Sequence, residues 1–186
     1  MTAVTMKFGG GQLLEERLRK MARNLQNARE VKVGFLADAT YASDGGARLA
    51  SAAKRAQKEG RTGWARLFAS WAKWQAKNGG VLHIAQVAFW MEFGTRRSKP
   101  RPFFRRMIRS KSPRWGYWIA RFLKASDFDA QRALSLLGQL ISEQLQESIR
   151  SWPADNKPMT VFIKGFNHGL LDRSTMARHV DFQVLD

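Results

Sequence analysis

Apolar side chains recur every three or four residues in two long segments of the chain, and this spacing predicts two amphipathic helices. The first segment covers residues 12–29 and the second covers residues 127–150. Ser126 or Asp127 is expected to cap the second helix, because a short polar side chain there can accept a hydrogen bond from the first turn. The apolar stripes are Leu14, Leu18, Met21 and Leu25 in the first helix and Leu134, Leu137, Ile141, Leu145 and Ile149 in the second.

Three shorter segments have the composition and alternation of strands. They are EVKVGFLA at residues 30–37, MTVFIKGF at residues 159–166 and RHVDFQVL at residues 178–185. Combined with the long helices, they predict an α+β fold in which a small, mostly antiparallel sheet packs against a long amphipathic helix. At 186 residues the whole chain is expected to form a single domain.

The middle of the chain has helical periodicity that glycines interrupt. Residues 47–77 are rich in Ala, Lys, Arg and Trp, and Gly60 and Gly63 are expected to divide them into two helices. With the loop that precedes them, these helices form a predicted helical insertion at residues 38–80. A short apolar helix follows the insertion and is expected to stop at Gly94.

Aromatic side chains recur at helical spacing in the second half of the insertion. We expect them to pack on the body of the domain or on a neighbouring chain, with base stacking on nucleic acid as the alternative. These residues are Trp64, Phe68, Trp71 and Trp74.

The composition is that of a chain with a packed core, since 44% of the residues are hydrophobic. The absence of cysteine excludes disulfides and thiolate metal sites. No apolar run reaches the roughly 18 residues that span a bilayer, and the N-terminal sequence lacks the pattern of a secretory signal. We therefore expect no membrane segment and a protein made in the cytoplasm.

Positive charge is concentrated in the middle of the sequence. The net charge is +17, and the segment from Lys54 to Lys124 contains 18 Lys or Arg and two acids, which gives +16. The positive electrostatic potential of such a segment favours binding to nucleic acid, to an acidic protein face or to an anionic membrane. A basic face that is simply exposed to solvent is the plainer interpretation.

Side chains able to perform catalysis are sparse. His83 lies in the short apolar helix and is expected to be a hydrogen-bonded structural residue. His168 and His179 do not form a metal-binding motif, and Asp172 with His168 is one possible acid–base pair. No serine or cysteine has the sequence context of a nucleophile. We therefore expect no enzyme, no metal and no cofactor, and a hydrolase built on Asp172 and His168 is an alternative hypothesis.

Two separated motifs resemble those of a known family. VAFWMEFGTRRSKPRPFFRRMI, residues 87–108, resembles an apolar helix that ends in glutamate, aromatic, Gly-Thr, then a basic loop and Pro-Arg-Pro-Phe. VFIKGFNHGLLDRSTMARHVDFQVL, residues 161–185, resembles the family's closing motif and final strand. Both are similar to the tail-completion and neck proteins of long-tailed bacteriophages, the lambda minor tail protein Z type.

This resemblance implies a structural virion protein that forms a ring, commonly a hexamer, at the neck or tail end. Such a ring completes the tail and joins it to the head connector around the passage for genomic DNA. The implied partners are other copies of the chain, the adjacent connector or head-completion protein, the tail-terminator or tail-tube protein, and DNA in the lumen. Assembly would take place in the host cytoplasm.

The basic segment after the apolar helix is the expected contact between ring subunits. Prolines stiffen such a loop, aromatic rings anchor it and arginines face acidic groups. Glu92, at the end of the helix, is expected to form a buried ion pair with one of the following arginines. The expected interface residues are Glu92, Phe93, Arg96, Arg97, Arg101, Pro102, Phe103, Phe104 and Arg105.

Exposed cations of the insertion form a second candidate contact, with DNA or with an acidic partner. They are Lys54, Arg55, Lys58, Arg61, Lys73 and Lys77. They also support the alternative function, a sequence-tolerant nucleic-acid-binding protein that uses the basic, Trp-rich middle segment.

Overall fold

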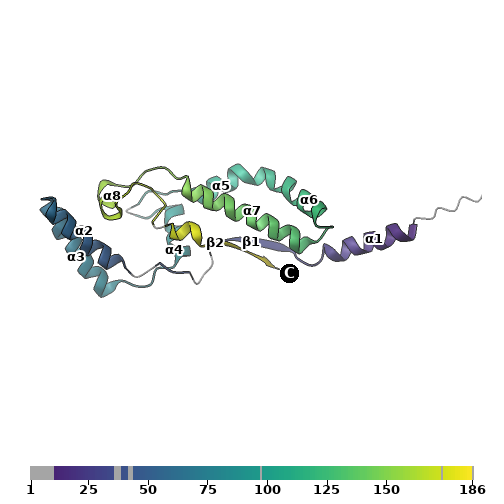
Figure 1. Cartoon of the computed structure of the whole chain (residues 1–186), viewed down its shortest axis with the longest axis horizontal. Coiled ribbons are helices and arrows are strands. Elements are labelled where there is room, and N and C mark those ends of the chain that lie inside the picture. Colours follow the sequence, from purple (N-terminus) through teal and green to yellow (C-terminus); the bar gives the residue numbers. More distant parts are fainter. Residues whose placement is uncertain (1–10, 36–38, 42–43, 97, 173, 186) are drawn as a thin grey trace, which may run out of the picture. The chain divides into compact units, whose positions relative to one another are not determined.

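The computed structural model describes residues 11–35, 39–41, 44–96, 98–172 and 174–185 and has an α+β fold (Figure 1). The helices are α1 (Gly11–Asn24), α2 (Gly45–Lys58), α3 (Thr62–Asn78), α4 (Ile84–Phe93), α5 (Phe103–Lys111), α6 (Trp115–Ala125), α7 (Ala130–Arg150), α8 (Pro158–Lys164) and α9 (Thr175–Arg178). A short 3-10 turn, η1 (Ser112–Arg114), precedes α6. The two strands, β1 (Glu30–Phe35) and β2 (Val180–Leu185), pair antiparallel.

The chain divides into two compact units. Of the described residues, the first unit comprises those within 1–33, 110–142 and 182–186, and the second comprises those within 34–109 and 143–181. Each unit is therefore assembled from segments that are far apart in the sequence.

In the first unit, α7 packs closely against the sheet at Gly138. A Cβ at this position would lie 2.5 Å from Phe182 Cδ2 on β2 and 2.8 Å from Val31 Cγ2 on β1. Because Gly138 has no side chain, α7 can approach both strands closely. This confirms the predicted packing of a long helix on a small antiparallel sheet. Leu137 and Ile141 on the predicted stripe are buried.

The long helix begins later than predicted, and its cap is a different residue. Asp127 and Phe128 have left-handed backbone conformations, with φ of 52° and 62°, and form the turn after α6. Asp129 then accepts a hydrogen bond on Oδ1 from the backbone N–H of Arg132 at 3.1 Å, as an N-cap does. The expectation that Ser126 or Asp127 caps this helix is wrong.

In the second unit, α2 and α3 form a helical hairpin around a small core. Gly60, with φ of 73°, makes the turn between them, so the predicted division of the insertion into two helices is confirmed. Ala52, Ala53 and Ala56 on α2 are buried against Phe68 on α3. Small alanine side chains let the two helices pack closely.

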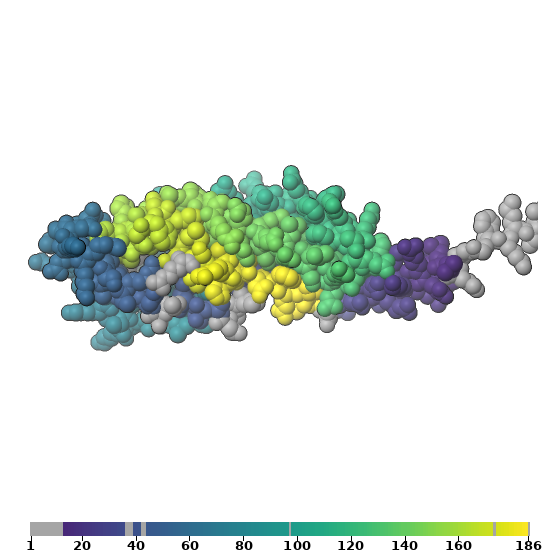
Figure 2. Space-filling model, viewed as in Figure 1, coloured from purple at the N-terminus to yellow at the C-terminus, as the bar shows by residue number. Residues whose placement is uncertain are grey.

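Residues 159–166, predicted as a strand, are helical, so this prediction is wrong. They form α8 and the residues just after it; Pro158 lies at the start of α8, and Gly165, in the left-handed conformation, caps its end. The apolar side chains Phe162 and Ile163, with Met159, pack on the hairpin core. Figure 2 shows the surfaces of α2 and of the chain near α8 side by side. The ring of Phe162 contacts the rings of Trp64 and Phe68 on α3. These contacts favour a helix at residues whose alternating pattern is also compatible with a strand.

The second half of this unit is built around α4, α5 and the end of α7. Gly94, with φ of 80°, ends α4 as predicted, and its missing side chain lets Pro100 N approach the position of a Cβ to 2.9 Å. Phe103 and Met107 on α5 are buried with Leu145 and Ile149 on α7. None of the helices in the described parts of the chain is long and apolar enough to cross a membrane.

Candidate functional site

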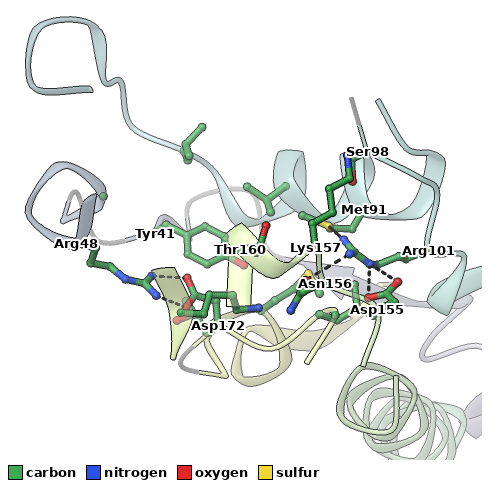
Figure 3. A pocket seen from close by; sticks show the side chains of 18 of the residues that line it. Tyr41, Arg48, Met91, Ser98, Arg101, Asp155, Asn156, Lys157, Thr160 and Asp172 are labelled. Carbon is green, nitrogen blue, oxygen red and sulfur yellow. Dashed lines mark hydrogen bonds and ion pairs between the residues drawn. The ribbon is translucent and has the colours of Figure 1, made fainter. Parts of the chain in front are cut away.

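A cavity of about 730 Å³ lies within the second unit (Figure 3). The segments that form its wall come from α2, α3, α4, α8, α9 and the connectors around them. Its charged lining residues are Arg48, Lys99, Arg101, Lys157, Lys164, Asp44, Asp155 and Asp172. This concentration of charge within one hollow makes the cavity the candidate functional site.

An ion pair between Arg48 on α2 and Asp172 before α9 forms one side of the cavity. Arg48 donates from both terminal nitrogens to the two carboxylate oxygens at 2.6 and 2.8 Å. The hydrogen bonds to Asp172 raise the pKa of Arg48 above its usual value. The pair joins residues 124 positions apart and so holds the loop before α9 against α2.

A second ion pair, between Arg101 and Asp155, lies on the opposite side of the cavity in Figure 3. Arg101 Nε donates to both carboxylate oxygens at 2.7 and 3.0 Å, and its side chain is only 12% exposed. Burial acts to raise the pKa of Asp155, but the hydrogen bonds from Arg101 and Trp152 outweigh it and lower that pKa. The pair ties the basic loop after α4 to the connector that precedes α8.

Gly169 gives Asp155 the space for this pair. A Cβ on residue 169 would collide with Asp155 Oδ1 and would lie 2.7 Å from Trp152 Cδ1. Glycine is therefore needed here for the close approach of a neighbouring side chain and not for an unusual backbone angle.

Tyr41 and Lys164 add two partly buried polar groups to the cavity. Burial raises the pKa of Tyr41 to about 12, and the charge of Asp172 adds to this effect, so the hydroxyl stays protonated. Lys164 Nζ donates to His168 O at 2.8 Å. Burial lowers the pKa of Lys164, because it disfavours the charged ammonium form.

The acid–base pair considered for catalysis is not assembled in this structure. The Asp172 carboxylate is bound by Arg48, and the ring nitrogens of His168 contact main-chain atoms. His168 Nδ1 accepts from Leu171 N at 3.1 Å, so Nε2 carries the proton and donates to Arg150 O at 2.7 Å. The histidine therefore joins the end of α7 to the loop after α8.

The predicted ion pair of Glu92 is confirmed, with Arg105 as the partner, but only the Glu92 side of the pair is buried. The Glu92 side chain is 6% exposed, and its Oε1 lies 2.8 Å from Arg105 Nε. The same carboxylate accepts the backbone N–H groups of Phe104 at 2.9 Å and Arg105 at 3.1 Å. Glu92 thus neutralises the first turn of α5, where unpaired N–H groups and the helix dipole favour an anion.

The residues predicted for a ring interface divide between core and surface. Phe103 is 1% exposed and packs edge-on to Phe35, so it has no surface to offer a neighbour, and the expectation of an exposed anchor there is wrong. Pro102, Phe104 and Arg101 are half-buried within their own unit. Phe93, Arg96 and Arg105 are exposed, whereas Arg97 lies outside the described residues.

The predicted cation patch of the insertion is exposed on α2 and α3. Arg55 and Arg61 lie over the ring of Phe162, and Arg55 also donates to Phe162 O, so both help to close the hairpin core. The exposed lysines are Lys54, Lys58, Lys73 and Lys77.

The four aromatic residues of α3 differ in burial. Phe68 is buried and Trp64 contacts it, which confirms the expected packing, whereas Trp71 and Trp74 are 42% and 63% exposed.

His83 lies at the N-cap position of α4, exposed, and not inside the helix as predicted. Its backbone pairs with Thr40 in an isolated antiparallel bridge.

The cavity itself was not predicted from the sequence. Its two ion pairs join residues separated by 124 and 54 positions, and no local pattern marks either pair. Within the described ranges, no group of three or more His, Asp or Glu side chains is arranged to hold a metal ion.

Comparisons of the chain with protein-family models, with curated proteins and with solved structures found no match.

Proposed function

We propose that this chain is a structural virion protein that assembles into a ring at the neck or tail end of a long-tailed bacteriophage. The ring would complete the tail, join it to the head connector and surround the DNA passage. The two motifs quoted above support this proposal, and a surface feature of the structure supports it independently.

The observation that carries the proposal is the apolar stripe of α1. Leu13, Leu14 and Leu18 on α1 are 75%, 60% and 56% exposed, and Leu25, which follows the end of the helix, is 45% exposed. The end of this helix is attached to its own unit, since Lys20 Nζ lies 2.8 Å from Asp127 Oδ2. A leucine stripe left in water is unfavourable at about 25 cal/mol per Å², so it indicates a helix that packs on another chain.

A second exposed apolar surface lies on α4, beside the basic motif. Phe89, Trp90 and Phe93 are 59%, 37% and 53% exposed, and the rings of Phe89 and Phe93 are 4.7 Å apart. The guanidinium of Arg105 lies 4.8 Å from the Phe93 ring centroid. Aromatic and arginine side chains dominate the binding energy of many protein interfaces. We therefore assign the contact between ring subunits to the aromatic surface of α4 and to α1. Phe103 is buried and Arg101 is half-buried within their own unit, and both stabilise the loop and helix next to this surface.

Two leucine-to-serine substitutions on α1, Leu14→Ser and Leu18→Ser, test the proposal. The protein with both changes should lose its oligomers in native mass spectrometry, and phage carrying them should yield tails without heads. Tyr117→Ser, which removes another exposed apolar side chain, is the matched control and should leave both readouts unchanged. Normal virions from phage in which the whole gene is disrupted would refute the proposed function.

A second candidate function is sequence-tolerant nucleic-acid binding, which the exposed lysines of the hairpin and Trp74 favour. Each phosphate contact contributes about −0.9 to the slope of log K against log salt. Replacing Lys54, Lys58, Lys73 and Lys77 with glutamine should then reduce the slope for a labelled DNA duplex by about 3.6. An unchanged slope would exclude this surface as the binding site.

A further inference from the structure

The cavity of the second unit has more positive charge than its own carboxylates neutralise. Among its described lining residues, five side chains are cationic and three are acidic, which gives a net charge of +2. Both arginines are paired with aspartates, so the excess resides on the lysines, Lys99, Lys157 and Lys164. A hollow with this balance of charge attracts an anionic group.

Lys164 is the lysine best placed to recognise such a group, because it is partly buried whereas Lys99 and Lys157 are exposed. Its side chain lines the cavity, and its ammonium is held in place by the hydrogen bond to His168 O at 2.8 Å. Burial disfavours its charge, and a bound carboxylate would relieve that cost by supplying a partner of opposite sign. The hydroxyls of Tyr41 and Thr160 also line the cavity and can donate to the same carboxylate.

The remaining lining indicates that the ligand is also apolar. Leu82, Val87, Met91, Leu170 and Met176 contribute the hydrophobic part of the wall. The volume of about 730 Å³ is in the range of cavities that enclose a ligand of several residues or a small molecule. Figure 3 shows the two ion pairs on opposite sides of the hollow, with Tyr41 and Thr160 labelled between them, which suits an elongated ligand.

We infer that this cavity binds a short extended segment of a partner protein, in which an Asp or Glu carboxylate contacts Lys164 and neighbouring apolar side chains contact Leu82 and Met91. The inference rests on the proposed function, because an assembly protein meets other chains at its surface. A chain with a net charge of +17 has complementary partners in acidic proteins. A free carboxylic acid shares the same chemistry, and the experiment separates the two.

The experiment uses the full chain with labelled methyl groups on leucine, valine and methionine. The probes are hexanoate, hexanamide, a blocked pentapeptide Leu-Asp-Leu-Glu-Leu and its Leu-Asn-Leu-Gln-Leu counterpart. Methyl signals of the cavity wall should shift with hexanoate and the acidic peptide, but not with the two neutral probes. The acidic peptide should bind about tenfold more tightly than hexanoate, because it also fills the apolar wall.

Substitutions of Lys164 then test its role. Lys164→Met should weaken the acidic peptide by about 10- to 100-fold, as loss of a charged hydrogen bond predicts, while Lys164→Arg should retain most of the affinity. Lys124→Met, at an exposed position on α6, is the control. Thermal unfolding of each variant verifies that it is folded.

Three outcomes overturn the inference: equal response to neutral and acidic probes, full affinity in Lys164→Met, or binding of hexanoate without binding of the peptide. The last result assigns the cavity to a small carboxylic acid. Ring formation is measured separately by native mass spectrometry. A chain that forms oligomers but does not bind the peptide therefore refutes this inference alone.

Discussion

Replacing Glu92 with glutamine tests whether one buried carboxylate organises the basic motif. Glutamine keeps the shape of the side chain but removes its charge, and it offers a single acceptor oxygen where the carboxylate has two. The carboxylate now accepts two backbone N–H groups, from Phe104 and Arg105, and the Nε–H of Arg105. At least one of these donors loses its partner in the variant.

The magnitude follows from the separate contacts. Loss of an N-cap interaction costs about 1 kcal/mol, and loss of a hydrogen bond to a charged group costs about 1.5–3 kcal/mol. The ion pair adds little, because the Arg105 side chain is 56% exposed and such pairs are worth about 0–1 kcal/mol. These contributions overlap, and we expect Glu92→Gln to destabilise the start of α5 by about 2 kcal/mol.

Amide hydrogen exchange of Phe104 and Arg105 measures this change locally. A loss of about 2 kcal/mol should lower their protection by roughly 30-fold and lower the melting temperature by about 4–8 °C. Arg105→Gln removes the ion pair but leaves the cap, so its effect should stay below about 1 kcal/mol. Equal effects of the two substitutions would refute the capping role, as would unchanged exchange of both amides in Glu92→Gln.

Three further predictions concern packing and pH. Gly138→Ala should destabilise the first unit by about 1 kcal/mol, since overpacking against Phe182 outweighs the better helix propensity of alanine. Urea unfolding measures this loss of stability, and a gain in stability would contradict the close packing of α7 on the sheet. Gly169→Ala should break the Arg101–Asp155 pair, seen as faster exchange in the loop after α4, and an unperturbed loop would show that the pair does not need this glycine. Because the folded state lowers the pKa of Asp155 below its usual 3.8, its contribution to stability is present above pH 3.8 and is lost as the pH falls through the lowered value. The stability difference between wild type and Asp155→Asn should therefore shrink in acid, and a constant difference would refute the linkage.

Local patterns in the sequence were sufficient for most of the helices. The spacing of leucines marked α1 and α7, and glycines marked the ends of α4 and the turn between α2 and α3. These signals are local because they depend on which side chains share a helix face and on which residues tolerate a positive φ. An ion pair of Glu92 with one of the following arginines was also predictable, since several of them follow it within one short segment, and the structure identifies Arg105 as the partner.

Other features were decided by contacts between distant segments. Residues 159–166 fit a strand pattern, yet the aromatic core of the hairpin holds Phe162 on a helix. The sequence predicted that Phe103 anchors a contact between subunits. In the structure it is buried, because it packs against Phe35 and the end of α7.

The cavity depends on the same kind of long-range contact. Arg48 and Asp172 carry no local signal of their pairing, because an ion pair forms wherever the fold brings opposite charges together. The sequence by itself therefore determined most of the helices, the end of α4 and the excess of positive charge. The tertiary structure decided which of those charges are paired inside the second unit and which remain exposed, since burial and pairing depend on how the chain folds.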